Sequence, residues 1–271
     1  MKKYLIIFFL ICLYFFNTII WLCRFWFSDI RNIYGFVIFL ATILLLISKI
    51  NRGNIKIASI RNSKYFLILI PILILDLLNL YYFKISIISA FLFIISITIL
   101  LFLFVEKKYY EQILIISLLL FLSLPLLFYT NSIVGILFRR FYSVSIFEII
   151  HLINPKTELV NTIIITGNIY TNIDSGCSGV SNIYLLSVFT LILSYYRNLK
   201  IMRIIFFIIV ISCIYVLINW IHLLLMTYSN NILEINNLRN SHKFVSNFIT
   251  VFMTSFTIIM LNYFNGNFKT D

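Results

Sequence analysis

The chain has 271 residues, of which 62% are hydrophobic and only 11% are charged, whereas an ordinary soluble domain carries about 25% charged residues. This composition excludes a soluble globular protein, because too few polar side chains are available to cover its surface. The net charge of +12 does not indicate nucleic-acid binding, since no basic stripe with interleaved aromatic residues lies outside the apolar runs.

Apolar runs of membrane-spanning length recur along the chain. A hydrocarbon core about 30 Å thick needs roughly 20 apolar residues to cross, and only helices or closed barrels satisfy the backbone there. The runs are continuous, whereas barrel strands alternate. We therefore predict an all-α polytopic membrane protein with about eight transmembrane helices in a single domain, residues 1–271. The predicted helices cover residues 4–23, 33–50, 65–83, 85–105, 113–130, 179–196, 204–226 and 243–263.

The first apolar run follows Lys2 and Lys3, as in a secretory signal peptide. No small-x-small cleavage site follows, and the run continues through Cys23, which makes it long enough to span. We expect the segment to be retained as the first transmembrane helix.

Two polar residues interrupt the third predicted helix. Asp76 lies inside the apolar run, and Asn79 follows about one helical turn later. An ionisable residue within the membrane is a functional candidate. The pairing with Asn79 favours the alternative, a structural polar contact between helices.

The distribution of basic residues predicts the orientation of the helices. An even number of helices places both termini on one side of the membrane. With the N-terminus inside, the inner segments hold 13 of the 21 Lys and Arg residues and the outer segments hold 8. The positive-inside rule therefore predicts an inner or plasma membrane protein with both termini in the cytoplasm.

The longest stretch outside the predicted helices is residues 131–178, which this orientation places on the extracytoplasmic side. Residues 141–153 are too rich in apolar side chains for a solvated loop, so we predict an amphipathic segment at the membrane interface. Gly167-Asn168 between two β-branched runs indicates a hairpin. We expect a short two-stranded ribbon over 159–174 that leads into the sixth helix.

Cys177 lies just before the sixth predicted helix, within the sequence Asp-Ser-Gly-Cys-Ser-Gly-Val at 174–180. At a helix N-terminus, unpaired backbone N–H groups and the helix dipole stabilise a thiolate. The same N–H groups can stabilise an oxyanion formed on attack at a carbonyl, and Gly176 and Gly179 leave space for a substrate backbone. A nucleophilic cysteine and a buried structural cysteine in a tight turn both fit these residues.

Cys177-Ser178-Gly179, opening a late helix after a short extended outer segment, resembles the exosortase/archaeosortase family. Members are polytopic, usually eight-helix, membrane transpeptidase-like cysteine enzymes, and the resemblance covers roughly residues 131–263. It implies processing of exported proteins that end in a short motif, a transmembrane helix and a basic tail. In bacteria the family often accompanies exopolysaccharide production.

The resemblance implies a catalytic set on the last three helices. Cys177 matches the family nucleophile, and His242, at the start of the eighth helix, matches the family histidine. The family's Asn-x-x-Arg near the outer end of the penultimate helix is met by Asn219 and His222, so a histidine stands at the arginine position. This departure matters because Arg is always charged and presents a fixed fork of donors, whereas His is charged only when protonated.

Four further residues are expected to assist as oxyanion or substrate contacts. They are Ser178, Gly179, Asn219 and Arg239. We predict a covalent acyl transfer in which Cys177 forms a thioester and His242, alone or with His222, acts as the base. No metal or other cofactor is expected, because one cysteine and two histidines from separate loops lack a zinc-site spacing.

The expected partners are membrane lipid and the tailed exported proteins, not nucleic acid. The replacement of the arginine keeps an alternative open, a non-catalytic exosortase-related membrane scaffold in exopolysaccharide or surface-protein export. A transporter or polymer-assembly protein is a third possibility, although the predicted helices contain few polar residues apart from Asp76 and Asn79.

Overall fold

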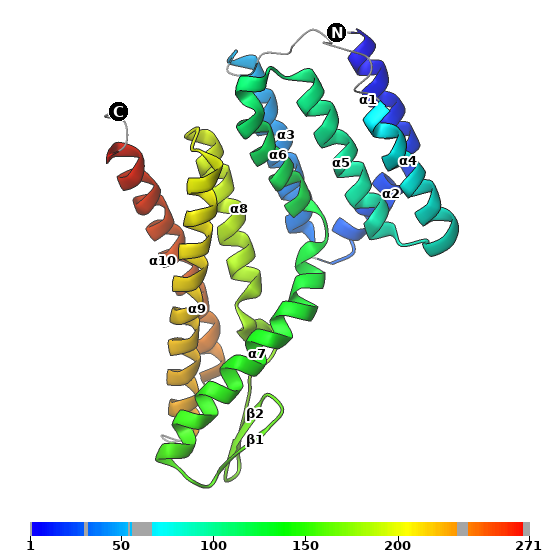
Figure 1. The fold of residues 1–271 in the computed structure, drawn as a ribbon. Coiled ribbons are helices and arrows are strands. Elements are labelled where there is room, and N and C mark those ends of the chain that lie inside the picture. Colours follow the sequence, from blue (N-terminus) through cyan, green and yellow to red (C-terminus); the bar gives the residue numbers. More distant parts are fainter. Residues whose placement is uncertain (1, 30–31, 54, 56–66, 232–237, 268–271) are drawn as a thin grey trace. The chain divides into compact units, whose positions relative to one another are not determined.

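A computed structural model of the chain describes residues 2–29, 32–53, 55, 67–231 and 238–267. Within these residues the chain forms ten α-helices and one small antiparallel sheet (Figure 1). The predicted all-α polytopic membrane fold is confirmed. The helices and strands divide into two compact units, residues 1–126 and 127–271, which are described in turn. The prediction that the whole chain is one membrane domain stays a prediction.

The first unit is a bundle of apolar helices. Its helices are α1 (Lys2–Tyr14), α2 (Phe16–Trp26), α3 (Ile33–Asn51), α4 (Leu69–Leu78), α5 (Ser86–Phe104) and α6 (Tyr110–Ser123), with a π-turn at Asn79–Phe83 and a 3₁₀ turn at Lys107–Tyr109. The helix α5 contacts α1, α2, α4 and α6, and α3 packs along α6. Trp26 links α2 to α6, since its indole Nε1 donates to the backbone carbonyl of Ser123 at 3.0 Å.

The polar pair of the third predicted helix is buried, with Asp76 in α4 and Asn79 at the start of the π-turn that follows it. Asn79 Nδ2 donates to Ser89 Oγ at 2.9 Å and to the carbonyl of Ile85 at 3.0 Å, which confirms the predicted contact between helices for this residue. Asp76 is only 1% exposed. The Tyr14 hydroxyl lies beside its carboxyl group, while the oxygen Oδ1 has no hydrogen-bond partner among the described residues.

The second unit contains the remaining elements. They are α7 (Leu126–Ile153, which starts at the boundary), β1 (Thr157–Val160), β2 (Ile163–Thr166), β3 (Ile169–Asn172), a 3₁₀ turn at Ser175–Ser178, α8 (Val180–Tyr196), α9 (Ile201–Asn231) and α10 (Leu238–Asn267). The helices α8, α9 and α10 pack against one another, and β3 contacts α9 (Figure 1).

Each of the eight predicted transmembrane helices falls on an apolar helical segment. By length and composition, α3, α5 and most of α9 can each cross a membrane, and two bent helix pairs raise this number to five among the described residues if each pair is one crossing. The pair α1 and α2 is bent by 68°. The three other predicted helices coincide with shorter apolar segments, Leu69–Phe83, Val180–Tyr196 and Phe248–Tyr263. The total number of crossings stays a prediction.

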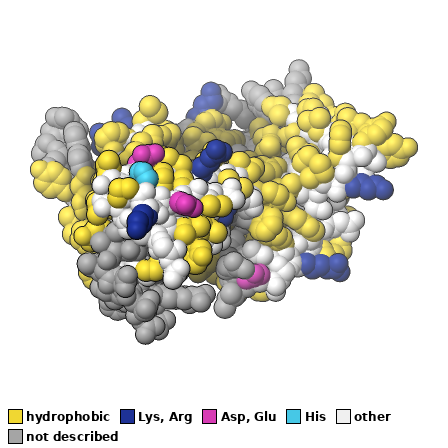
Figure 2. Space-filling model, turned by 90° about the horizontal axis from the view of Figure 1, so that it is seen from below, with side chains coloured by type: hydrophobic (Ala, Val, Ile, Leu, Met, Phe, Trp, Pro, Cys, Tyr) yellow, Lys and Arg dark blue, Asp and Glu magenta, His cyan; other side chains and the backbone are white. Residues whose placement is uncertain are grey.

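The outer surface of the helices is apolar, as a lipid environment requires. Viewed from below, the described side chains are mainly hydrophobic, with only a few charged side chains among them (Figure 2). On α7, for example, Ile133, Leu137 and Phe141 are all more than half exposed. Such a surface would be an aggregation liability in water but is compatible with lipid contact.

The fifth predicted helix, residues 113–130, is interrupted within its length. The helix α6 ends before Leu124-Pro125, and α7 begins directly afterwards. Proline has no N–H to donate and forces the preceding residue into an extended conformation, and Leu124 has φ −64° and ψ 161°. The predicted interfacial segment 141–153 is likewise not a separate element, because it forms the second half of the continuous helix α7.

The predicted two-stranded ribbon is a three-stranded antiparallel sheet with the order β1-β2-β3. The hairpin at Gly167-Asn168 is confirmed, and Gly167 has a positive φ of 59°. The missed turn lies at Asn161-Thr162, where Asn161 adopts φ 58°, a left-handed conformation that Asn tolerates better than most residues. The ribbon therefore has one more strand than two β-branched runs indicated.

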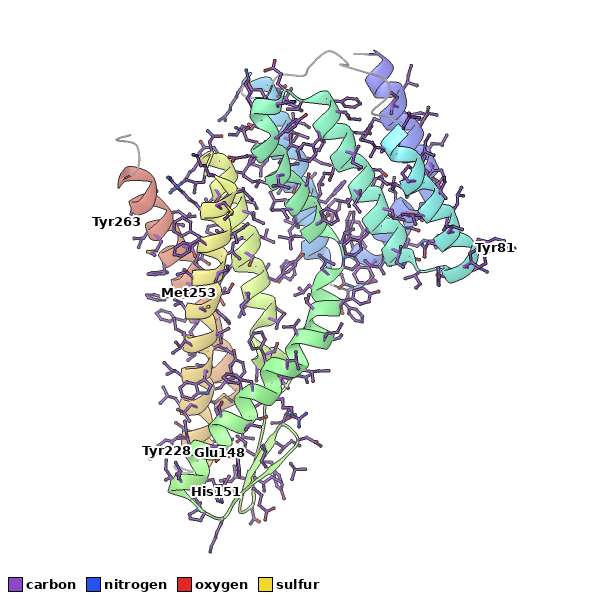
Figure 3. All side chains as sticks on the ribbon, in the orientation of Figure 1. Tyr81, Glu148, His151, Tyr228, Met253 and Tyr263 are labelled. Carbon is purple, nitrogen blue, oxygen red and sulfur yellow. The ribbon has the colours of Figure 1, made fainter. Side chains whose placement is uncertain are left out.

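The sheet is fastened to the last turn of α7. His151 Nδ1 lies 3.1 Å from the carbonyl of Thr157, the first residue of β1, and its ring packs on Phe147 with centroids 5.2 Å apart. Glu148 and His151 of α7 and Tyr228 of α9 lie at this same end of the second unit (Figure 3). These contacts give His151 a structural role at the junction of helix and sheet.

Candidate functional site

Cys177 lies in the 3₁₀ turn that connects β3 to α8. Asp174 caps this turn: its Oδ1 accepts the backbone N–H of Gly176 at 2.8 Å and that of Cys177 at 3.2 Å, and its own carbonyl accepts the Cys177 N–H at 3.1 Å. Gly179 then leads into α8, which begins at Val180. The cysteine is thus one short turn before the helix, and its N–H group is already engaged by Asp174.

Gly179 is required by the close approach of α9. Its φ of 72° lies in the left-handed region, which L side chains rarely adopt. A Cβ atom at this position would stand 2.8 Å from Tyr215 Cε1 and 3.2 Å from Asn219 Nδ2. The sequence suggested that this glycine leaves space for a substrate, whereas in the structure it leaves space for α9.

Asn219 holds the carbonyl side of the same turn. Its Nδ2 donates to the backbone carbonyl of Cys177 at 3.0 Å, and the residue is only 6% exposed. The sequence predicted a substrate or oxyanion contact at this position. The amide fixes the backbone of the cysteine to α9, so Asn219 positions the turn, and its contact with a substrate stays a prediction.

Ser178 connects the turn to α7. Its hydroxyl donates to the carbonyl of Ser175 at 2.9 Å and also lies 3.2 Å from Asn131 Oδ1. The residue is 1% exposed, so its side chain serves packing between the turn and α7. Gly135 permits this arrangement, because a Cβ there would stand 2.8 Å from Asn131 Oδ1.

The cysteine side chain belongs to an apolar cluster built by α7, the sheet and α9. The buried members of this cysteine cluster are Tyr142, Ile146, Ile150, Ile164, Ile173, Cys177 and Leu223. Trp220 braces it, since its Nε1 donates to Ser145 Oγ of α7 at 2.8 Å, and Asn230 Nδ2 donates to Thr171 Oγ1 of β3 at 3.1 Å. The helices α7 and α9 and the sheet thus enclose one thiol.

Burial and, secondarily, the neighbouring Asp174 carboxylate raise the pKa of the Cys177 thiol to about 12. The residue is 8% exposed, and desolvation disfavours the charged thiolate. The expectation of a thiolate stabilised by the helix N-terminus therefore does not hold for this conformation. Ionisation of the sulfur needs a base or a change of surroundings.

The remaining predicted site residues are His222, Arg239 and His242, which lie on α9 and α10. His222 follows Asn219 by three residues on α9, where residues share one face of a helix, and it is partly buried. Arg239 and His242 lie in the first turns of α10, but their side chains lie outside the described residues. Among the residues that are described, no group of three or more His, Cys, Asp or Glu side chains is placed to hold a metal ion.

A sequence model described as transmembrane exosortase matches residues 26–263, which is most of the chain. The chain belongs to the transmembrane exosortase family. The match also reaches well into the first unit, beyond the residues that carried the resemblance. No curated protein and no solved structure matches the chain significantly. Family membership supports an exosortase-like function in the membrane.

Several residues around the cysteine of this exosortase family member were missed in the sequence. Asp174 stands three residues before Cys177, a capping spacing that could have been recognised. Asn131 and Tyr142 had no such signal, because α7 brings them to the site through tertiary packing. Tyr215 also had none, and its hydroxyl accepts a hydrogen bond from Asn182 Nδ2 on α8.

Proposed function

We propose that the chain is an exosortase-like membrane cysteine peptidase or transpeptidase that acts through a thioester on Cys177. Its proposed substrates are exported proteins that end in a short motif, a transmembrane helix and a basic tail. In the orientation predicted from basic residues, both termini are cytoplasmic and the reaction takes place at the outer face of the membrane.

The observation that carries this proposal is that side chains bind both the backbone N–H and the backbone carbonyl of Cys177, in a chain of the exosortase family. Asp174 engages the N–H group and Asn219 the carbonyl of the same residue. Side chains from two different parts of the chain therefore fix the main chain of the residue that carries the sulfur. A nucleophile benefits from this, because small displacements of the attacking atom slow a reaction strongly.

The proposed reaction begins with attack of the Cys177 sulfur on the carbonyl carbon of the scissile peptide bond. A sulfur–carbon bond forms, and the carbon–nitrogen bond breaks when the tetrahedral intermediate collapses. The thiol proton passes through the base to the leaving amine. Water or an amine then attacks the thioester carbonyl and releases the acyl group, which returns the thiol.

The high pKa of the thiol makes a base essential to this scheme. A thiol with a pKa of about 12 is almost entirely protonated at neutral pH, and the thiolate is the nucleophile. We assign the base to His242, alone or with His222. A protonated histidine beside the sulfur would also offset the negative charge of Asp174, which acts against the thiolate.

A second candidate function is a non-catalytic exosortase-related scaffold in surface-protein or exopolysaccharide export. The deep burial of Cys177 and the histidine at position 222 favour it. An accessible thiol with a working base distinguishes the enzyme from the scaffold.

The proposed function is tested by co-expression with an exported reporter that carries a C-terminal motif, a transmembrane helix and a basic tail. We expect Cys177→Ser and His242→Ala to abolish cleavage of the reporter while membrane insertion is retained. Cys213→Ser, which changes an exposed cysteine of α9, is the matched control and should cleave normally. Full cleavage by both Cys177→Ser and His242→Ala would overturn the proposed enzyme.

A further inference from the structure

The Tyr142 side chain of α7 carries a buried hydroxyl group inside the cysteine cluster. The residue is 0% exposed, and its hydroxyl lies beside the side-chain amide of Asn219, which holds the Cys177 carbonyl. Among the residues that the structure describes, no acceptor receives a hydrogen bond from this hydroxyl, and the Asn219 amide nitrogen beside it is itself a donor. Such groups are rare in folded proteins, because burial removes their bonds to water without a replacement.

Neighbouring polar groups at the site do have partners. The Tyr215 hydroxyl accepts from Asn182, and Ser145 of α7 accepts from the Trp220 indole. The Tyr142 ring is also held firmly, since it stacks on Phe138 with centroids 6.0 Å apart and planes inclined by 20°. The hydroxyl is therefore a fixed donor that this conformation leaves unused.

We propose that the Tyr142 hydroxyl donates a hydrogen bond to the carbonyl oxygen of the acyl group that Cys177 attacks. This inference rests on the proposed thioester chemistry. The N–H group of Cys177 cannot readily serve as the donor, because Asp174 already engages it. A phenol donates without bringing a charge into an apolar site, and a donor fixed in advance pays no reorganisation when the oxyanion develops.

The exposed part of the turn provides the route for the acyl group. Ser175 and Gly176 are exposed, whereas the next residue, Cys177, is buried. A carbonyl that reaches the sulfur from this side enters a dry, apolar cluster. A hydrogen bond to its oxygen is stronger there than in water.

The test compares two reactions of the same thiol in the purified full-length protein in lipid nanodiscs. With p-nitrophenyl acetate at alkaline pH, the thiol gives its proton to solvent and the sulfur attacks the ester carbonyl, which forms a sulfur–carbon bond and a tetrahedral oxyanion. The oxyanion collapses when the ester carbon–oxygen bond breaks and p-nitrophenolate leaves. Iodoacetamide alkylates the sulfur without any oxyanion. Mass spectrometry of the peptide that contains Cys177 gives both rates separately from the other cysteines.

We expect Tyr142→Phe to slow acylation of Cys177 about tenfold to a hundredfold, with alkylation changed by less than about twofold. The melting temperature should change little, because the hydroxyl donates to no described group and only its contact with the Asn219 amide is lost. Tyr195→Phe is the matched control: it changes another tyrosine with 0% exposure, in the last turn of α8, and should leave both rates unchanged.

The outcomes separate this inference from the function on which it rests. Equal acylation of Tyr142→Phe and the unaltered protein would overturn the role of Tyr142 and leave the thioester proposal intact. A parallel loss of acylation and alkylation would assign Tyr142 to packing and would also overturn the inference. Failure of the ester to acylate Cys177 in the unaltered protein would overturn the nucleophile and this inference together.

Discussion

Asn219 of α9 donates a hydrogen bond of 3.0 Å from its side-chain amide to the backbone carbonyl of Cys177, 42 residues earlier in the chain. The bond ties the turn that carries the sulfur to a long helix. It is buried, and a buried carbonyl that loses its partner costs more than an exposed one. The position of the sulfur therefore depends on α9 as much as on its own turn.

Replacing Asn219 with Ala should lower the free energy of unfolding by about 1–3 kcal/mol, because the Cys177 carbonyl stays buried without its donor. Release of the turn from α9 should also speed alkylation of the thiol by iodoacetamide. Thermal unfolding in detergent and mass spectrometry measure the two effects. Asn230→Ala is the control: it removes a hydrogen bond from α9 to β3, so it should destabilise the protein without speeding alkylation of Cys177. If Asn219→Ala matches the unaltered protein in both unfolding free energy and alkylation rate, the hydrogen bond does not hold the turn.

Replacing Asp174 with Asn should lower the pKa of the Cys177 thiol. The carboxylate is the second cause, after burial, that raises this pKa, and Asn removes the charge while it keeps an oxygen able to cap the turn. The pH profile of alkylation should shift to lower pH, so that the rate at a fixed alkaline pH increases. Glu158→Gln removes an exposed carboxylate from β1 and should leave the profile in place. An unshifted profile for Asp174→Asn would contradict the assigned charge effect.

The same pKa shift makes stability depend on pH. The thiol pKa rises from its ordinary value of 9.0 to about 12 on folding, so the folded state binds this proton more tightly than the unfolded state. The stabilisation is complete below pH 9 and is lost as the pH rises towards 12. Across this range the unaltered protein should lose stability relative to Cys177→Ala, measured by thermal unfolding. A difference that does not vary with pH would show that the two states bind the proton equally.

Replacing Gly179 with Ala should destabilise the fold more than the same change at Gly167. Both glycines have positive φ, 72° and 59°, which costs an L residue about 1–2 kcal/mol. Only at Gly179 does the new Cβ meet a neighbour, Tyr215 Cε1 at 2.8 Å, whereas nothing lies within 4 Å of Gly167. Overpacking adds about 1–3 kcal/mol. Equal losses of unfolding free energy in the two variants would contradict the close approach of α9.

The sequence predicted the apolar helices well because each long hydrophobic run has one stable solution in lipid. It predicted their interruptions less well. Pro125 carries a local signal for the break between α6 and α7. Phe15 carries none: the bend between α1 and α2 occurs where this residue is buried at 1% exposure and packs on Phe93, with centroids 5.4 Å apart. Packing of this kind cannot be inferred from one sequence.

The site residues that lie in short sequence motifs were predicted, whereas those brought to the site by tertiary packing were not. Cys177 and Asn219 were found through short motifs, and the structure joins them by a hydrogen bond. Tyr142 was not found, because a tyrosine in an apolar helix has no pattern that indicates a donor. The thiol pKa was predicted in the wrong direction, since the helix N-terminus is visible in the sequence and the apolar cluster around the sulfur is not. The relation of His242 to Cys177 stays a prediction.

The capped turn has a kinetic consequence for the cysteine. With its N–H group bound by Asp174 and its carbonyl bound by Asn219, the Cys177 main chain has little freedom to swing outwards. The remaining motion of the sulfur is rotation about the Cα–Cβ bond, which has three staggered wells. Exposure of the thiol therefore becomes a choice among side-chain rotamers within the cluster and does not require the turn itself to open.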